Sequence, residues 1–310
     1  MTWDPANLPD LRGRTYAVTG ATGGIGYFAA EQLAAAGAEV VLASRSAAKI
    51  EVAAETLRHH VPGAATRAVT IDLTSLDSVA SAAAELAGLP RLDGILLNGA
   101  PMQFSTRART ADGLPLILGA HTVANVALIG HLLPTLAAAT VGTPTRIVHT
   151  STGFVGRFPT DASDLTLTPR FGVVAYTKAK TVTEIFAFEL DRRLRAAGVP
   201  VASIVSRPGV GVDAKTPERA GIRDSTVGYR RNPYTPWAQG KDAAAWSGVR
   251  ALVDPDAVGG QYYAPREGIR GVPVPVEPYP HTARPDPELA GRLWRELEDL
   301  ARVRVPLDSV

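Results

Sequence analysis

The sequence predicts an α/β protein built on one doubly wound parallel sheet of about seven strands, with helices on both faces. Short apolar segments alternate along the chain with helical segments of about a dozen residues, an order typical of β-α-β units. Three of the apolar segments are unbroken, namely Val40–Ala43, Gly94–Asn98 and Arg146–Thr150. Strands covered by helices on both faces have this composition, whereas half-exposed strands alternate.

The strands are expected where apolar or β-branched runs stop at glycine or polar residues. They are Thr15–Thr19, Glu39–Ala43, Thr66–Ile71, Asp93–Leu97, Arg146–Thr150, Val199–Ser206 and a short last one at Gly260–Ala264. The helices are expected at Gly24–Ala36, Ala47–His59, Ser75–Ala87, Thr122–Ala138, Val174–Ala197, Lys241–Val253 and Pro287–Arg302. Gly37 and Gly198 follow two of these helices at the position where glycine commonly ends a helix. The proline-rich stretch 268–285 is expected to be irregular.

Length and composition bound the class of protein. A chain of 310 residues suits one domain, residues 1–310, with a substrate lid at 211–240 and a C-terminal extension at 265–310 that ends in a helix. The formal charge of +2 disfavours nucleic acid as a partner. The absence of cysteine excludes thiolate nucleophiles and cysteine-based metal sites, and we expect no metal. The N-terminus lacks a signal-peptide pattern, so we expect a cytoplasmic protein.

One segment is long enough to suggest a membrane span. From Leu114 to Thr145 there is no Asp, Glu, Lys or Arg. The segment contains Pro115, His121 and Asn125, which would be costly in lipid. We therefore expect a helix buried inside the protein or at a subunit interface, and no membrane span.

A glycine-rich turn follows the first strand. The run Thr19–Gly26 reads TGATGGIG and leads directly into a predicted helix. Gly20 permits a tight turn, Gly24 lets the backbone approach a pyrophosphate, and Gly26 lets the helix pack close to the strand. The N–H groups at the start of the helix suit phosphate. The turn therefore predicts a dinucleotide site, to which Thr22, Gly23 and Ile25 also belong.

A second motif carries chemistry. Tyr176 and Lys180 form YxxxK on a predicted helix, so both side chains can point into one pocket. A nearby ammonium favours phenolate, and we expect the pKa of Tyr176 to be lowered. The phenol could then donate or accept a proton near neutral pH.

With TGxxxGIG and YxxxK together, the chain resembles the short-chain dehydrogenase/reductase family from Gly13 to about Leu300. The resemblance implies a Rossmann fold and a nicotinamide cofactor. Tyr176 follows Thr152 by 24 positions, a longer spacing than in most members of the family. This spacing, with Tyr262-Tyr263 and Leu293-Trp294 late in the chain, resembles the retinol dehydrogenase and protochlorophyllide reductase branch.

The end of the second strand indicates which cofactor is used. An NAD enzyme would place an acid there to bind the ribose hydroxyls, whereas this chain has Arg45 and, one helical turn on, Lys49. A guanidinium suits a 2′-phosphate, so NADP(H) is favoured over NAD(H). The resemblance further assigns cofactor contacts to Lys180 and to three segments that follow strands, namely Asp72-Leu73, Asn98-Gly99-Ala100 and Pro208-Gly209-Val210.

The resemblance also assigns the remaining catalytic groups. The hydroxyl that polarises the substrate falls on Thr152, with Ser151 as the alternative one position earlier. The usual asparagine of the family falls on His121, which could relay protons through a water or could be a structural histidine, and the sequence leaves both readings open.

These residues predict an NADPH-dependent carbonyl reductase or alcohol dehydrogenase that acts on a ketone or aldehyde. Tyr229, Tyr234 and Trp237 of the lid could line a largely apolar substrate pocket. Two alternatives stay open: reduction of a C=C bond, and a non-catalytic NADP-binding sensor. In similar proteins the charge-poor helix and the Tyr-Lys helix form the association surface, so a homodimer or homotetramer is possible.

Overall fold

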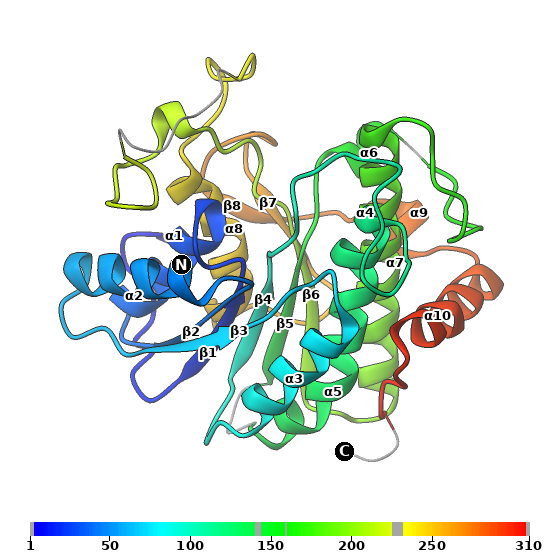
Figure 1. The fold of residues 1–310 in the computed structure, drawn as a ribbon, viewed down its shortest axis with the longest axis horizontal. Helices are drawn as coiled ribbons and strands as arrows, with labels where there is room; N and C mark the ends of the chain where they lie inside the picture. The colour runs from blue at the N-terminus through cyan, green and yellow to red at the C-terminus, as the bar shows by residue number, and fades with distance from the viewer. Residues whose placement is uncertain (1–2, 140–143, 159, 225–231, 308–310) are drawn as a thin grey trace.

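The computed structural model describes residues 3–139, 144–158, 160–224 and 232–307, and these contain one eight-stranded sheet (Figure 1). The strand order is β3-β2-β1-β4-β5-β6-β7-β8, and every neighbouring pair is parallel except β7 and β8. The doubly wound α/β fold is therefore confirmed. The strands are β1 (Thr15–Thr19), β2 (Glu39–Ser44), β3 (Thr66–Thr70), β4 (Gly94–Leu97), β5 (Thr145–Thr150), β6 (Val201–Ser206), β7 (Tyr262–Pro265) and β8 (Pro273–Val276).

The expected number of about seven strands is one too low, because β8 lies in the stretch predicted to be irregular. Pro273 and Pro275 lack the N–H that a central strand needs, which argues against a strand in the sequence. In the structure β8 is the last strand of the sheet and pairs on one side only, with Pro273 opposite Pro265. An edge position tolerates proline, and the sheet thereby gains its single antiparallel strand.

Helices cover both faces of the sheet, as Figure 1 shows. One apolar cluster joins α3, α5 and α7 to one face, and a second joins α1, α2 and α8 to the other. The strands between these layers are buried on both sides, which explains their unbroken apolar sequences. The helices are α1 (Gly24–Ala35), α2 (Ala47–His60), α3 (Leu76–Ala87), α4 (Leu116–Leu118), α5 (Ala124–Ala138), α6 (Phe154–Arg157), α7 (Gly172–Ala196), α8 (Lys241–Val253), α9 (Pro280–Ala283) and α10 (Pro287–Ala301).

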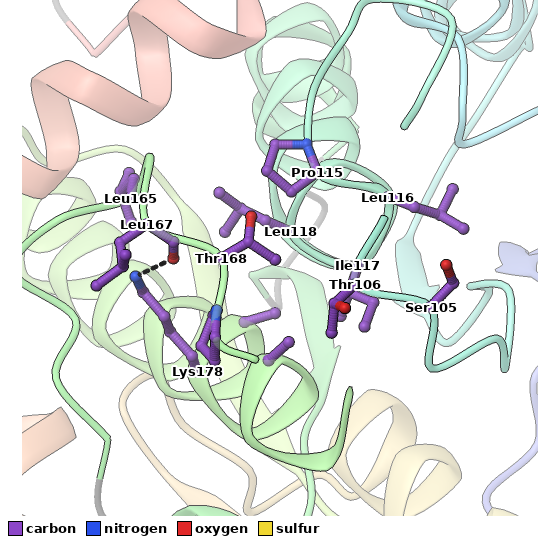
Figure 2. A pocket seen from close by; sticks show the side chains of 13 residues that line it. Ser105, Thr106, Pro115, Leu116, Ile117, Leu118, Leu165, Leu167, Thr168 and Lys178 are labelled. Carbon is purple, nitrogen blue, oxygen red and sulfur yellow. Dashed lines mark hydrogen bonds between the residues drawn. The ribbon is translucent and has the colours of Figure 1, made fainter. Parts of the chain in front are cut away.

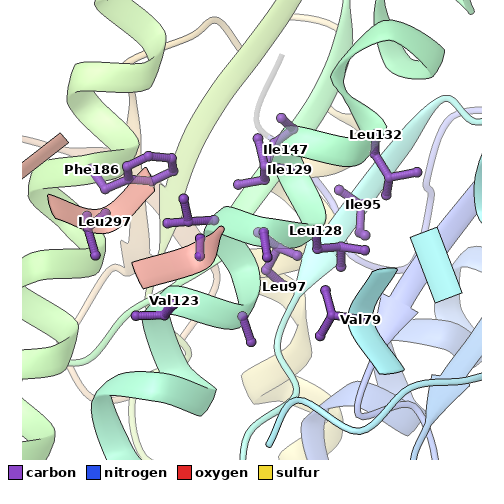
Figure 3. Close-up of a cluster of buried hydrophobic side chains, with 14 of the residues drawn as sticks. Val79, Ile95, Leu97, Val123, Leu128, Ile129, Leu132, Ile147, Phe186 and Leu297 are labelled. Atoms are coloured by element: carbon purple, nitrogen blue, oxygen red, sulfur yellow. The ribbon is translucent and has the colours of Figure 1, made fainter. Parts of the chain in front are cut away.

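The charge-poor segment forms a core helix, as predicted. A π-helical turn, Gly119–Val123, joins α4 to α5, so the helical run extends from Leu116 to Ala138. By length and composition this run could cross a membrane, but 94% of its most apolar window is buried inside the protein. Figure 3 shows Val123, Leu128, Ile129 and Leu132 from this run packed between the sheet and the helices beside it.

The C-terminal helix α10 lies against α5 and α7 (Figure 1). Trp294 stacks on Phe186 of α7 with ring centroids 5.1 Å apart. The Arg193 guanidinium also lies over the Trp294 ring, 4.3 Å from its centroid. After the helix, Val303 packs against Gly130 of α5, where an added Cβ would come within 2.7 Å of the valine. The chain's own end therefore covers this flank of the two helices.

Candidate active site

The glycine-rich turn between β1 and α1 is shaped for close backbone approach. Gly20 has φ +71°, and Gly24 has φ +56°, conformations that other residues rarely adopt. A Cβ on Gly26 would lie 2.3 Å from the Gly20 carbonyl oxygen, so only glycine fits there. No side chain caps the first turn of α1, which leaves its N–H groups available to an anion.

The turn after β4 is held directly against this glycine-rich turn. The Thr19 hydroxyl accepts hydrogen bonds from the backbone N–H groups of Asn98, at 3.0 Å, and Gly99, at 2.8 Å. A Cβ on Gly99 would lie 2.8 Å from the Gly20 nitrogen. One buried threonine thus fixes both loops, a role that a single sequence does not reveal because its partners lie about eighty positions away.

A cleft of about 340 Å³ opens between these two loops and the ends of β2 and β3. Its walls bring together nine of the predicted cofactor residues, namely Gly20, Thr22, Gly23, Arg45, Lys49, Asp72, Leu73, Gly99 and Ala100. Ser44, Ile71, Thr74, Pro101 and Met102 also line it and were not predicted. Gly24, Ile25 and Gly26 form the first turn of α1, Asn98 lies in the turn after β4, and none of the four is among the residues that line the cleft. Thr22 and Ser44 are linked by their hydroxyls at 3.0 Å, and Thr74 donates to Asp72 through both N and Oγ1.

Arg45 and Lys49 stand at the rim of the cleft. Both side chains are exposed, and neither has an ion-pair partner in the part of the chain that the structure describes. Two cations that form no ion pair among the described residues give this end of the cleft a positive potential, which suits an anionic ligand.

The Pro208-Gly209-Val210 segment leaves the carboxyl end of β6. Gly209 has φ +70°, and Val210 donates to the Ile269 carbonyl at 2.9 Å. Gln239 fixes the segment further by donating to the Pro208 carbonyl at 3.0 Å and accepting from the Gly271 N–H. The three predicted residues are not among those that line the 340 Å³ cleft. They follow β6, which pairs with β5.

Tyr176 and Lys180 lie one turn apart on α7, with the Lys180 nitrogen 6.0 Å from the phenol ring centroid. The ammonium donates to the Thr150 carbonyl, at the end of β5, at 2.6 Å. Tyr176 contacts His121 edge to face, and the Nε2 of His121 lies 3.3 Å from the carbonyl of Pro101, which lines the cleft. This chain of contacts places the phenol beside one end of the cleft.

The ionisation of the pair differs from the expectation. Burial raises the pKa of Tyr176, and hydrogen bonding to Thr152 offsets this only in part. The expected lowering by Lys180 is wrong for this structure, because the ammonium is bound to Thr150 rather than to the phenol. Burial also lowers the pKa of Lys180 to about 8, and the Glu184 carboxylate opposes that change.

The two candidate hydroxyls at the end of β5 differ in their surroundings. Ser151 is buried and donates to Glu184 at 2.5 Å, so its hydrogen is directed into the protein. Thr152 is partly exposed, and its hydroxyl forms the hydrogen bond that opposes the rise in the pKa of Tyr176. The geometry therefore favours Thr152 over Ser151 as the group that faces a substrate.

His121 is buried on the π-helical turn between α4 and α5. Burial, with the charge of Lys180 as a second cause, lowers the pKa of His121 to about 3, so the ring is neutral at physiological pH. Its contact with the Pro101 carbonyl assigns the proton to Nε2. Nδ1 is then an acceptor, and it is buried without a partner among the described residues.

Glu184 is a buried carboxylate that sequence reasoning missed. It accepts hydrogen bonds from three hydroxyls, those of Ser151 at 2.5 Å, Tyr262 at 3.0 Å and Thr282 at 2.8 Å. It follows Lys180 by one helical turn, which was the available sequence signal. Its hydrogen-bond donors come from β7, α9 and the residue after β5, and their convergence exists only in the folded chain.

Two apolar rings lie against Tyr176, and further apolar side chains near it in sequence or at the cleft are exposed. The rings of Phe104 and Phe154 lie against the phenol, with centroids 5.4 Å and 6.4 Å away. Phe104 is 47% exposed, Met102 is 70% exposed and Phe171, next to the start of α7, is 66% exposed. Such exposed apolar side chains at one edge of a sheet are typical of a site that receives an apolar ligand.

A second, narrow pocket of about 20 Å³ lies on another face of α7 (Figure 2). Leu116, Ile117, Leu118 and Leu165 line it, together with the stem of Lys178, whose nitrogen donates to the carbonyls of Asp164 and Leu167. None of the candidate catalytic side chains reaches this pocket.

Two residues of the described part of the predicted lid, Arg219 and Ala220, contact α1 and α2. Arg219 forms a two-pronged ion pair with Glu31 of α1, at 2.7 Å and 2.8 Å, and Thr56 of α2 donates to the Ala220 carbonyl at 2.7 Å. Tyr234 and Trp237 are exposed, while Tyr229 lies outside the described residues. The lid's proposed role in substrate binding remains a prediction.

Comparison with known proteins supplies the family. A model described as short chain dehydrogenase matches residues 14–220. The chain is 33% identical to polyprenol dehydrogenase of Mus musculus, over 94% of this chain and 85% of that protein. It is 31% identical to retinol dehydrogenase 13 of Homo sapiens, over 96% and 87%. The crystal structure of an uncharacterised protein from Mycobacterium paratuberculosis is similar with a TM-score of 0.78 at 28% identity, over 99% and 100%. This chain therefore belongs to the short-chain dehydrogenase/reductase family of nicotinamide-dependent oxidoreductases, in the branch that resembles the retinol dehydrogenases.

Proposed function

We propose that the protein is an NADPH-dependent carbonyl reductase, or an alcohol dehydrogenase in the reverse direction, that acts on an apolar ketone or aldehyde. The observation that carries the proposal is the meeting of Tyr176, Lys180 and Thr152 at the carboxyl end of β5, beside the dinucleotide cleft.

The residues present fit a nicotinamide dinucleotide. The uncapped start of α1 and the glycine-only approach at Gly26 provide the place for a pyrophosphate. Asp72 and Leu73 line the cleft at the end where the adenosine would lie. Pro208 to Val210 follow β6, the neighbour of β5 in the sheet. When bound, the cofactor would supply or accept the hydride.

The protein's own residues would manage the proton. Because burial keeps Tyr176 protonated at neutral pH, the phenol suits the donor role in carbonyl reduction. Thr152 would donate a hydrogen bond to the same substrate oxygen. To stabilise the phenolate left behind, the Lys180 ammonium would turn from the Thr150 carbonyl toward the ring, whose centroid lies 6.0 Å away, and Nδ1 of His121 could hold a water beside the pair.

The preference for NADPH rests on Arg45 and Lys49. We expect Arg45→Leu to weaken NADPH binding by about tenfold or more, because a charge-assisted hydrogen bond to the 2′-phosphate is lost. NADH, which lacks that phosphate, should bind with unchanged affinity. Fluorescence titration of both cofactors measures the two constants. Wild-type turnover with NADH but not NADPH would overturn the assignment.

The apolar class of substrate rests on the rings of Phe104 and Phe154, which lie against the phenol, and on the exposed side chains of Met102 and Phe171. Two relatives carry the names of apolar alcohols, retinol and polyprenol, in agreement with this environment. Steady-state kinetics with NADPH against ketones and aldehydes of increasing chain length tests it, since KM should fall as the chain lengthens. A preference for short polar carbonyls would contradict the proposal.

The rate of reduction should decrease above about pH 8. As the pH rises through the Lys180 pKa of about 8, the ammonium loses the charge that stabilises phenolate. His121 and His149, which also face Lys180, stay neutral there because burial holds the pKa of each near 3. Glu184 raises the Lys180 pKa, so Glu184→Gln should move the alkaline limb to lower pH.

The matching measurement is kcat against pH for wild type and Glu184→Gln at saturating NADPH. The glutamine Oε1 can still accept from Ser151 and Tyr262, and its Nε2 can donate to the Thr282 hydroxyl, so the variant should keep its fold, which thermal unfolding checks. An alkaline limb that stays in place would show that Glu184 does not influence the Lys180 ammonium.

A further inference from the structure

We propose that Lys241 is a further cofactor-binding residue, which contacts the pyrophosphate, and that Asp213 holds its ammonium beside the phosphate site. The inference rests on the proposed dinucleotide site and adds a residue from the far end of the chain. Neither the glycine-rich motif nor the Tyr-Lys motif includes these two side chains.

Lys241 reaches the phosphate end of α1. It is the first residue of α8, and α8 packs along α1, with Gln32 of α1 donating to the Asp242 carbonyl at 2.8 Å. The Lys241 side chain runs past Gly24, and its Cδ lies 3.8 Å from where a Cβ on that glycine would be. Gly24 begins the first turn of α1, whose N–H groups are uncapped. The lysine therefore borders the surface that we assign to the pyrophosphate.

The other side of the lysine borders the loop after β6. Gly211 follows the Pro208 to Val210 segment, and a Cβ on it would lie 3.3 Å from the Lys241 Cα. Two residues further on, the Asp213 carboxylate binds the Lys241 nitrogen at 2.6 Å. The ion pair thus lies between the glycine-rich turn and the segment that would pass the nicotinamide.

This ion pair is suited to exchange partners. The two side chains are 28% and 27% exposed, so water screens the pair and its net stability is small. A pyrophosphate carries more negative charge than one carboxylate, and lysine binds phosphate as a mobile point charge. The ammonium can thus turn from Asp213 toward the phosphates, while without Lys241 the carboxylate would repel them.

The proposal predicts opposite effects for the two partners. Lys241→Met should weaken the binding of both NADP⁺ and NAD⁺ by about tenfold, because the charge-assisted contact to their common pyrophosphate is lost. Asp213→Asn should strengthen both by a few-fold, since it frees the ammonium and removes a negative charge. Lys241→Arg should retain most of the affinity. Isothermal titration calorimetry of the full chain measures each constant without turnover.

Lys215→Met is the matched control. It removes a lysine charge two residues from Asp213, but the Lys215 nitrogen donates to the carbonyls of Pro236 and Ala238. Its cofactor affinity should equal that of wild type, and thermal unfolding should show that all variants remain folded.

Each further outcome decides the matter. A loss confined to NADP⁺ would assign Lys241 to the 2′-phosphate and overturn the pyrophosphate contact. Unchanged affinity in Lys241→Met, or weaker binding in Asp213→Asn, would also overturn it while leaving the dinucleotide site intact. Wild-type protein that binds neither nucleotide would instead refute the proposed function.

Discussion

Tyr176→Phe is expected to reduce NADPH-dependent carbonyl reduction by about a hundredfold to ten-thousandfold, since the variant lacks the proton donor. Phenylalanine keeps the ring that packs against His121 and Phe104, so the pocket should keep its shape. NADPH should therefore bind with wild-type affinity. Stopped-flow measurement of NADPH oxidation, with a separate binding titration, separates the two effects.

A tyrosine elsewhere provides the control. Tyr263→Phe removes a hydroxyl that donates to Gln261 at 2.8 Å, within the apolar cluster of α1, α2 and α8, and should leave the reduction rate unchanged. If Tyr176→Phe turned over as fast as wild type, the phenol would not be the donor. A protein without reductase activity in either form, yet with NADPH bound, would favour the non-catalytic alternative.

Gly26→Ala should both destabilise the fold and prevent tight cofactor binding. The new Cβ would lie 2.3 Å from the Gly20 carbonyl oxygen and 2.8 Å from the Asn98 side-chain nitrogen. The first of these is backbone, so α1 must move away from the turn, at a cost of about 1–3 kcal/mol. The same movement displaces the N–H groups at the start of α1 from the phosphate site. Chemical denaturation and NADPH titration measure the two losses.

Gly23→Ala is the comparison for stability. Gly23 has φ 175°, which any residue adopts, and no atom lies within 4 Å of an added Cβ. Its free energy of unfolding should match that of wild type. Equal destabilisation by the two substitutions would show that the Gly26 contact does not restrict the packing of α1.

The parts of the site that the sequence predicted are local. The glycines of the phosphate turn lie within a few residues of one another, and so do Tyr176 and Lys180. Secondary structure alone therefore assembles each of these two motifs. The sequence also predicted the alternation of strands and helices, because each element carries its own apolar pattern.

The parts that escaped prediction depend on distant segments. Glu184 gains its role from hydroxyls on β7 and α9, and Thr19 gains its role from the turn after β4. The pKa of Tyr176 depends on burial, which periodicity does not quantify, and so the expected direction was wrong. Strand β8 has a composition that disfavours strands and forms because β7 offers it a free edge.

The position of α10 changes how a second subunit could approach. The sequence suggested that α5 and α7 form the association surface, but Trp294 and Val303 already occupy that flank. Removal of residues 287–307 would expose the apolar side chains of α5 and α7 that Trp294 and Val303 now cover.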